Sequence, residues 1–486
     1  MSIGTGLAIA SSGLSAIDQQ MAVVSQNVAN ATTPGYSVET VSLSAETAGG
    51  QGSGVIAGPA TRQLNASIQA QVNQSLAQNS YQGIVSSTLS GIDQVMGTPG
   101  QNNDLPSLVA NLQSGFQTLL TDPSSTVQQL SVVNSAQSLT SQINTIANTV
   151  QSAVQSTGNT VAADVKKLNT TLATIGSLNA QIINLGQQNK STADLTNKRD
   201  LAIQTVASLT GAKTISQANG AVSLFSPNGI ELPLNGTSQV TVSSTASGTA
   251  FSVGGTAVSF GGELGGAQQL VNTTLPQIQG GLDSFSQALS ARFANAGLSL
   301  FTDPSGGVPS SSTTGFSASI TVNPAVTANP ASVRDGTNTV TSSSGAVLFT
   351  PNPPSGPAGF TGLIQNVLGS ALGTTTLSGS VQPAAISTYS DASGTATLPY
   401  SGSGSLTTVA SSFTANEATL SSSAKTAATN ASGLATALQT QAASTSGVNI
   451  DQQMSLLVTL QNAYAANAKT VTIAQQMWQA VQAMVQ

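Results

Sequence analysis

The sequence contains no cysteine and no histidine. Without these residues the chain cannot form disulfides, a thiolate nucleophile, or a zinc site with Cys or His ligands. A histidine general base is also missing, so Ser-His-Asp and Cys-His catalytic arrangements are excluded. We therefore expect no enzyme activity, and no catalytic, cofactor-binding or metal site.

Charge is also scarce. Charged residues make up 6% of the 486 residues, against about 25% in typical soluble domains. Lys and Arg total 11 and the net charge is -6. No clustered basic face is present for nucleic acid, and no polybasic patch for a membrane surface. A surface of uncharged polar residues suits a protein packed against copies of itself, although a secreted adhesin has a similar composition.

Targeting and membrane segments are missing as well. The first basic residue is Arg62, so the charged start of a secretory signal is absent. No apolar stretch reaches the roughly 18 residues of a membrane span. These rules indicate a cytoplasmic protein, whereas the lack of Cys and of charge favours export. The two indications agree only if the chain is exported without a cleaved signal.

The N-terminal segment carries a regular apolar stripe. Its spacings alternate between three and four, which is the a/d seam of a helix that packs on another helix. Its members are Ile3, Leu7, Ala10, Leu14, Ile17, Met21, Val24 and Val28. The dipeptide Pro34-Gly35 ends the helix, because Pro restrains the preceding residue and Gly tolerates positive φ.

The C-terminal segment carries a second seam. It is formed by Ile450, Met454, Leu457, Leu460, Tyr464, Val471, Ala474, Trp478, Val481 and Val485. Asn467 interrupts it, either to fix register or as a tolerated polar residue. We expect the two ends to pack on each other or on equivalent helices of adjacent subunits, and to be disordered in an isolated monomer. Ordinary intramolecular core is the alternative.

The middle of the chain alternates between helical and β patterns. Helices are predicted over about 61–96, 108–120, 124–185 and 264–300, and from Leu406 to the end with a break at Ser446-Gly447. Alternation around Pro227-Asn228-Gly229 predicts a hairpin that joins Val222/Leu224 to Ile230/Leu232. Gly261 to Gly266 reads as a linker, and 301–400 as strands and loops.

These patterns predict a multidomain α+β protein with a coiled-coil core of terminal helices, a long-helix bundle and an inserted β-rich outer domain. The predicted domains are 1–48 plus 446–486 (terminal), 59–210 plus 262–300 plus 404–445 (bundle), and 211–261 plus 301–403 (outer). The densest charge cluster is Asp194, Lys198, Arg199 and Asp200. Asp194 and Lys198 are spaced i, i+4, which is typical of a surface pair.

Segments at both ends of the chain, and three in the middle, resemble a known family. Residues 25–37, SQNVANATTPGYS, resemble the signature of flagellar rod, hook and hook-associated proteins. Residues 446–454 and 461–469 resemble the paired C-terminal signature. The segments 194–201, 262–266 and 322–325 are similar to those of hook-associated protein 1. Val38-Glu39 replaces the family's basic residue after the turn, and Gln475-Gln476 replaces its acidic pair.

The resemblance implies a structural subunit of the bacterial flagellum that joins hook to filament and is needed for motility. It also implies that the chain is exported unfolded by the type III apparatus and that its terminal domain lines the central channel. The implied partners are the chain itself in a ring or helical assembly, hook protein, hook-associated protein 3, and an export chaperone on the C-terminal region. Hook protein or another axial protein is the alternative, followed by a secreted adhesin; a hydrolase with paired carboxylates has the least support. The expected assembly interface comprises Leu7, Leu14, Ile17, Met21, Val24, Val28, Asn30, Pro34, Gly35, Tyr36, Met454, Leu457, Leu460, Tyr464, Asn467, Val471, Trp478 and Val481.

Overall fold

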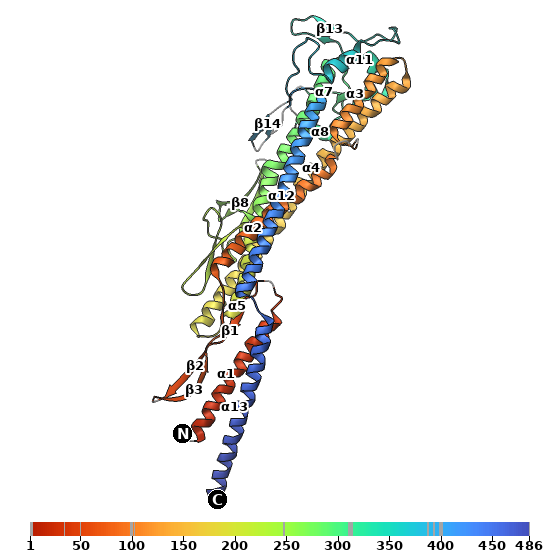
Figure 1. Cartoon of the computed structure of the whole chain (residues 1–486). Helices are drawn as coiled ribbons and strands as arrows, with labels where there is room; N and C mark the ends of the chain where they lie inside the picture. Colours follow the sequence, from red (N-terminus) through yellow and green to blue (C-terminus); the bar gives the residue numbers. More distant parts are fainter. Residues whose placement is uncertain are drawn as a thin grey trace.

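The protein is elongated, and both of its ends lie at the same extremity (Figure 1). The structure is a computed structural model that describes residues 3–33, 35–48, 50–97, 101, 103–245, 248–309, 314–385, 388–391, 394–397 and 402–485. Long helices at both ends and small sheets between them confirm the predicted multidomain α+β class. Along the described residues, no helix combines the length and apolarity of a membrane span.

The two termini form an antiparallel helix pair. Helix α1 (Ile3–Ala29) packs on α13 (Ile450–Val485). The seam between these two helices buries few residues. Among the described residues of the pair, its buried cluster consists of Ile17, Val24 and Leu460. Three partly buried residues pack beside it: Met21, Leu457 and Ala463. The two predicted seams therefore meet within one chain.

A hairpin and a short strand pair follow α1. Strands β2 (Leu43–Ala48) and β3 (Gln51–Ala57) form the hairpin, and β3 lies against α1. The Ser12 hydroxyl, within α1, accepts a hydrogen bond from the Val55 backbone N–H at 3.1 Å. Strands β1 (Glu39–Thr40) and β4 (Thr61–Arg62) pair at the base of this excursion and lead into the body.

The body is built from long helices. Asn65, Ser125 and Ser405 cap the N-termini of three of them with their side chains, which satisfies N–H groups that a helix leaves unpaired. Helix α12 packs along α2, and α4 packs on α3 and α5. The helices are α2 (Ala66–Met96), α3 (Leu105–Thr121), α4 (Thr126–Gln187), α5 (Ala193–Thr210) and α12 (Leu406–Ser446).

Small sheets cover α5 and the C-terminal half of α4. They share a core with these helices that includes Leu172, Val206, Leu224 and Phe251. Strand β6 pairs with β5, and β8 lies between β7 and β9. The strands are β5 (Lys213–Ser216), β6 (Val222–Phe225), β7 (Val240–Thr245), β8 (Gly248–Val253) and β9 (Thr256–Val258).

The hairpin predicted around Pro227-Asn228-Gly229 is only partly right. Strand β6 forms a regular antiparallel ladder with β5, which precedes it in the chain, and not with the segment after the turn. Across the turn there is an isolated bridge between Phe225 and Glu231, and the Leu232 N–H donates to the Leu224 carbonyl at 2.8 Å. Strand β6 therefore has β5 on one edge and residues 230–232 on the other.

The predicted linker at Gly261 to Gly266 is wrong. Residues Gly262–Gln269 form α6, which packs against α2. A Cβ on Gly266 would lie 2.8 Å from the Tyr81 carbonyl oxygen. The glycines therefore allow two helices to approach closely. The predicted helix over 264–300 is accordingly three segments: α6, a π-helical turn η1 (Leu270–Thr274) and α7 (Leu275–Asn295).

The distal end contains the largest core. It joins α3, α4, α7 and α12 to residues between 298 and 385, and Phe116, Phe293 and Phe301 are fully buried in it. The region predicted as strands and loops also contains short helices. Its described elements are β10 (Phe301–Thr302), α8 (Phe316–Ser319), β11 (Thr321–Val322), α9 (Pro324–Ala328), α10 (Ser332–Asp335), β12 (Val340–Thr341), β13 (Val347–Phe349), α11 (Gly362–Asn366), η2 (Val367–Ala371), β14 (Thr388–Asp391) and β15 (Gly394–Thr397).

The two β-containing inserts pack in different places. Residues 212–260 belong to the core of lower α4 and α5, and the residues from 301 onward belong to the distal core. The division of the chain into three domains at the boundaries given above remains a prediction.

Candidate functional site: the terminal helix pair and its polar joint

The surface of α13 is unusually apolar. Of the twenty large hydrophobic side chains exposed among the described residues, ten lie on this one helix. They are Ile450, Met454, Leu456, Val458, Tyr464, Ile473, Met477, Trp478, Val481 and Met484. So many exposed apolar side chains on one helix indicate a contact surface on a soluble protein.

Two contacts define the register of the terminal pair. The Asn27 amide donates a hydrogen bond to the Gln453 side-chain oxygen at 3.1 Å. A Cβ on Gly13 would lie 3.4 Å from the Asn467 side-chain nitrogen. Asn467 therefore faces a position without a side chain, and the polar residue that interrupts the seam fits there. Its role in fixing register remains a hypothesis.

The predicted interface residues on the two terminal helices fall into three groups according to their burial. Ile17, Val24 and Leu460 are buried within the chain and hold the pair together. Leu7, Leu14, Met21, Val28, Leu457, Asn467 and Val471 are half-buried. Met454, Tyr464, Trp478 and Val481 are exposed.

The predicted turn residues lie where α1 ends. Gly35 is exposed at φ +79° and Tyr36 is half-buried. Asn30 donates to the Gln26 carbonyl at 3.0 Å, a contact local to α1. Pro34 lies outside the described residues.

A buried asparagine joins the terminal pair to the chain that leaves it. Asn27 is 1% exposed. Its amide N–H groups donate to Gln453 and to the Glu39 carbonyl, and its carbonyl accepts from the Glu39 N–H and the Tyr36 hydroxyl, both at 3.0 Å. Every hydrogen-bonding position of the side chain is thus used, as burial requires.

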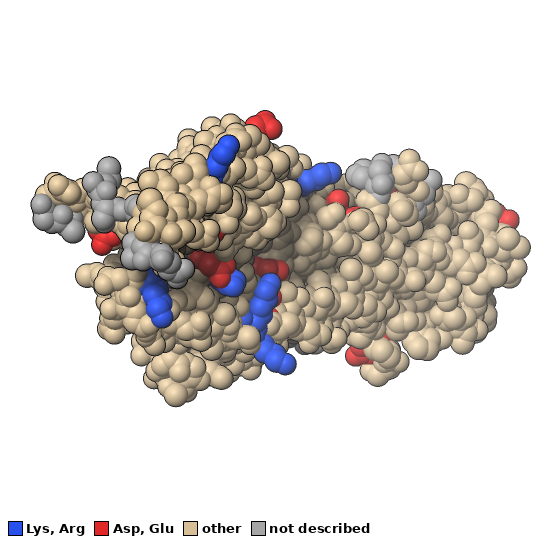
Figure 2. Space-filling model, turned by 90° about the horizontal axis from the view of Figure 1, so that it is seen from below, with Lys and Arg blue, Asp and Glu red and all other residues tan. Residues whose placement is uncertain are grey.

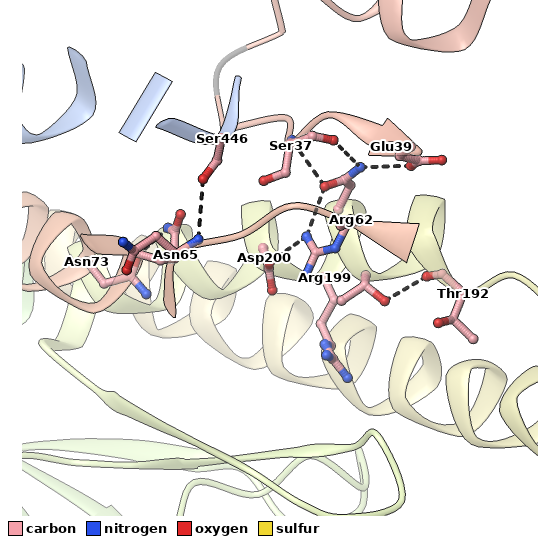
Figure 3. Close-up of polar contacts among 12 residues, drawn as sticks. Ser37, Glu39, Arg62, Asn65, Asn73, Thr192, Arg199, Asp200 and Ser446 are labelled. Carbon is pink, nitrogen blue, oxygen red and sulfur yellow. Dashed lines mark hydrogen bonds and ion pairs between the residues drawn. The ribbon is translucent and has the colours of Figure 1, made fainter. Parts of the chain in front are cut away.

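A second group of polar residues connects the strand pair β1–β4 to α5 (Figure 3). Asn197 donates to the Glu39 carboxylate at 2.9 Å and accepts from Arg62 at 2.9 Å. Arg62 also forms an ion pair with Asp200 at 2.7 Å, with both side chains largely buried. We call Asn27, Glu39, Arg62, Asn197 and Asp200 the polar joint.

Burial shifts the ionisation of the polar joint. Desolvation raises the pKa of Glu39, and the neighbouring Asp194 raises it further, while the Asn197 hydrogen bond and Arg62 act in the opposite direction. Desolvation, followed by the charge on Glu39, raises the pKa of the Tyr36 hydroxyl. Tyr36 therefore stays protonated and acts as a donor to Asn27.

Ser446, at the end of α12, makes two hydrogen bonds beside the polar joint. The Ser446 carbonyl accepts from the Val38 N–H at 2.8 Å, and its hydroxyl accepts from the Asn65 N–H at 3.3 Å. Figure 3 shows Ser446 above Asn65. The end of α12, the exit from α1 and the start of α2 are thereby linked at one place.

Sequence reasoning missed most of this joint. Asn27 lies inside the quoted signature, which is the one signal that pointed to it. Asn197 and Asp200 are close in sequence and lie in the quoted segment 194–201, but Arg62 is more than 130 residues from both, and only the fold brings it to them. The predicted surface pair is confirmed: Lys198 and Asp194 lie 2.8 Å apart and about half exposed.

The terminal pair offers almost no charge to a partner. Helix α1 contains only Asp18, α13 contains Asp451 and Lys469, and residues 470–485 contain no charged residue. Figure 2, seen from the end at which the termini lie, shows few charged side chains on a largely uncharged surface. Contacts made here depend on apolar burial rather than on ion pairs.

Three family models match the chain. The flagella basal body rod protein model matches residues 7–36, the helical-domain model of flagellar hook-associated protein FlgK matches residues 89–300, and the C-terminal model of the flagellar basal body rod FlgEFG proteins matches residues 439–484. Together they cover more than half of the chain, and each describes a flagellar component.

A solved structure is also similar: the flagellar hook junction protein FlgK from Burkholderia pseudomallei, at 22% identity and a TM-score of 0.42. The match covers 49% of this chain and 45% of that one, so the chain spans less than half of that structure. No curated protein sequence matches significantly.

The matched segments include both terminal helices and three residues of the polar joint, Asn27, Asn197 and Asp200. The other two joint residues lie between the matched segments. The protein is a structural component of the flagellar axis. It belongs to the family of flagellar hook-associated protein 1, whose helical domain gives the longest of the three matches.

Proposed function

We propose that this protein joins the flagellar hook to the filament, outside the cell, and that it does so through the terminal helix pair. The observation that carries the proposal is the set of ten exposed apolar side chains on α13, which the chain itself leaves uncovered. Burial of apolar area contributes roughly 25 cal/mol per Å². Many copies side by side would cover this surface and stabilise the pair.

The proposed partners follow from this position. They are further copies in a ring or helical assembly, hook protein on one side and hook-associated protein 3 on the other, with an export chaperone holding the C-terminal region before assembly. The alternative within the family is hook protein itself. It predicts a long tube of this chain, whereas a junction protein forms a short zone.

The test is a deletion strain complemented with point variants. Cells without the protein should keep their hooks and release filament monomer into the medium. Loss of the hooks would favour the hook-protein alternative, and normal attached filaments would refute the proposal.

A matched pair of variants tests the surface. Ile473→Lys places a charge on the exposed α13 face, where the side chain is 50% exposed, and should abolish complementation. Val127→Lys changes a 77% exposed residue at the start of α4 and should restore motility fully. Equal motility of the two variants would contradict the proposed role of α13.

A further inference from the structure

A groove runs between α2 and α4 in the helical body. It consists of two adjoining cavities of about 500 and 420 Å³ that share four lining residues, among them Ser87 and Ser156. Most of the lining is Gly, Ala, Ser or Thr, and on α2 small residues recur every four positions at Gly83, Ser87 and Gly91. Residues four apart share one face of a helix, and small ones let another backbone approach that face closely.

The chain itself leaves this groove open. Glycine inside a helix is less favourable than alanine by about 0.8–1.0 kcal/mol. At Gly266 the glycine lets α6 lie against α2, but a Cβ on Gly83 or Gly91 would meet no neighbouring atom within 4 Å. These two glycines therefore make room that no other part of the described chain occupies.

Thr157 places a hydroxyl in the same groove without a partner. It lines both cavities and is 4% exposed. The hydroxyls of Thr149 and Thr160 donate to the carbonyls four positions earlier, at 2.8 and 3.1 Å. Within the described residues the Thr157 hydroxyl makes no such bond. Because buried polar groups are ordinarily hydrogen-bonded, the groove calls for a polar partner from outside the chain.

Two carboxylates lie at one end of the groove. Glu263 is the one charged residue among those that line it. Asp164 lies near Glu263, and its Oδ2 is buried without a hydrogen-bond partner among the described residues. Burial, followed by the charge of Glu263, raises the pKa of Asp164 to about 6, while Lys167 acts in the opposite direction. Asp164 is therefore mostly ionised at neutral pH, and a further cation would stabilise it.

The exposed side of α12 has complementary properties. It carries a stripe at spacings of three and four, which is the spacing with which helices pack on each other. Lys425 is the one charged residue in this stripe, and the other members are small. We call the stripe the outer stripe of α12; it comprises Ser411, Ala415, Ala418, Ser422, Lys425, Thr429, Ser432 and Thr436. Helix α2 packs on both α12 and α4, which scarcely touch each other, and no residue of α12 lines the groove.

The outer stripe and the groove lie at the same height along the molecule. Helices α2 and α12 run side by side in opposite directions (Figure 1), and the Asn65 N–H donates to the Ser446 hydroxyl at their common base. Ser87 follows Asn65 by twenty-two residues, and Lys425 precedes Ser446 by twenty-one, which is about 32 Å along either helix. Copies that stand side by side at equal height can therefore bring the outer stripe of one to the groove of the next.

We infer that the outer stripe of α12 packs into the α2–α4 groove of a neighbouring copy, with Lys425 directed to Glu263 and Asp164. The inference rests on the proposed assembly function and specifies its lateral contact. Three features single out α12: its small residues match the small lining, its one exposed charge is opposite to that of the groove, and its height is the same. Because the contact joins unlike surfaces at equal height, it closes into a ring, as a short junction zone requires.

Introduced cysteine pairs report this contact directly, since the chain contains no native cysteine. Ser156→Cys places a thiol on the α4 wall of the groove, and Ser422→Cys places one on the outer stripe; both positions are exposed. Flagella are isolated from the deletion strain complemented with the double variant and are mildly oxidised. We expect disulfide-linked species of two or more chains.

Ser423→Cys is the matched control, because it is exposed and adjacent to Ser422 but points about 100° away around the helix. Paired with Ser156→Cys it should give about tenfold less linked product, since a disulfide requires Cβ atoms within roughly 4.5 Å. Equal yields from the two pairs, or attached filaments without linked product, would overturn the inference and leave the assembly function standing. Normal filaments in the uncomplemented strain would instead overturn the proposed function.

A photoactivatable crosslinker on Ser156→Cys identifies the occupant of the groove. Mass spectrometry should find conjugates with α12 peptides of a second copy. Conjugates with a different flagellar protein in place of α12 would overturn the inference.

Filling the groove gives a second measurement. Gly91→Leu adds a side chain inside it, and Gly158→Leu adds the same side chain at an exposed position of α4 that lines neither cavity. Neither monomer should lose thermal stability, because Leu favours a helix more than Gly does. Gly91→Leu should abolish the 156–422 crosslink and Gly158→Leu should retain it. An undiminished crosslink in Gly91→Leu would contradict the packing of α12 in the groove.

Charge reversal tests the acidic end of the groove. Lys425→Glu and Glu263→Lys should each lower the yield of the 156–422 crosslink, because like charges then face each other. The two substitutions together should restore it. A combined variant no better than either single one would contradict the pairing of Lys425 with Glu263.

Discussion

The distal end of the body and the terminal pair are both helical, yet they are stabilised very differently. At the distal end α3, α4, α7 and α12 enclose one continuous core in which Phe116 and Phe293 are fully buried. The terminal pair buries three hydrophobic side chains in its own cluster and exposes ten on α13. The body buries its apolar side chains within one chain, whereas the pair leaves many of its own exposed.

The difference has a simple physical origin. A helix in a multihelix body can be covered on several sides, whereas each helix of a two-helix pair is covered on one. Isolated helices are marginal in water, and tertiary packing supplies most of their stability. The pair is therefore expected to open at low cost in the monomer, and stability and assembly can be varied separately by mutation.

The largest expected effect lies in the distal core. Phe293 is fully buried, with its ring 5.0 Å from Phe301 and 6.1 Å from Phe116. Phe293→Ala should lower the free energy of unfolding by about 3–5 kcal/mol, because it leaves a cavity. Denaturant unfolding monitored by circular dichroism measures the loss. A loss below about 1 kcal/mol would mean that the body is not the tightly packed half of the molecule.

A buried carboxyl in the body gives a pH-dependent effect. Burial raises the pKa of Glu417 in α12 to about 7 from 4.5. The folded state retains this proton while the unfolded state loses it, so stability falls as pH rises from about 4.5 to about 7. Glu417→Gln should be more stable than the parent at pH 8, on the order of 2–3 kcal/mol.

Thermal unfolding at two pH values checks this prediction. At pH 4 the parent Glu417 is protonated in both states and the two proteins should unfold at similar temperatures. A difference between them that is the same at pH 4 and pH 8 would show that the effect is packing rather than ionisation.

A smaller effect is expected at the polar joint. Asn27→Ala leaves the Glu39 N–H and the Tyr36 hydroxyl without their partner and should make local opening of the terminal pair easier by about 1–3 kcal/mol. Asn30→Ala, which removes only the local contacts with Gln26 and Thr33 at the end of α1, is the matched control. Hydrogen exchange of α1 and α13 measures the opening. Equal exchange in the two variants would argue against the joint as a support for the pair.

The smallest effect is expected from salt. The terminal pair carries only Asp18, Asp451 and Lys469, so screening has few charges on which to act. Raising the salt concentration from 50 to 500 mM should change self-association by no more than roughly twofold. Sedimentation at the two concentrations tests this, and a steep loss of association would indicate ion pairs between copies.

Local signals in the sequence identified the long helices and the two terminal seams. The break at Ser446-Gly447 and the long helix from residue 126 follow from turn residues and periodicity, which act over short distances. The strand partner of β6 and the helical state of Gly262–Gln269 were missed. Both depend on what lies beside the segment in space: β5 in one case and the backbone of α2 in the other.

By itself the sequence determined that this chain has no thiol or imidazole chemistry, almost no charge, and two apolar seams at its ends, because composition and spacing are properties of the chain alone. Only the tertiary structure decided which seam residues are used within the molecule and which remain exposed. It also decided that Asn27, Glu39, Arg62, Asn197 and Asp200 form one joint, since burial and long-range hydrogen bonds exist only once distant segments meet.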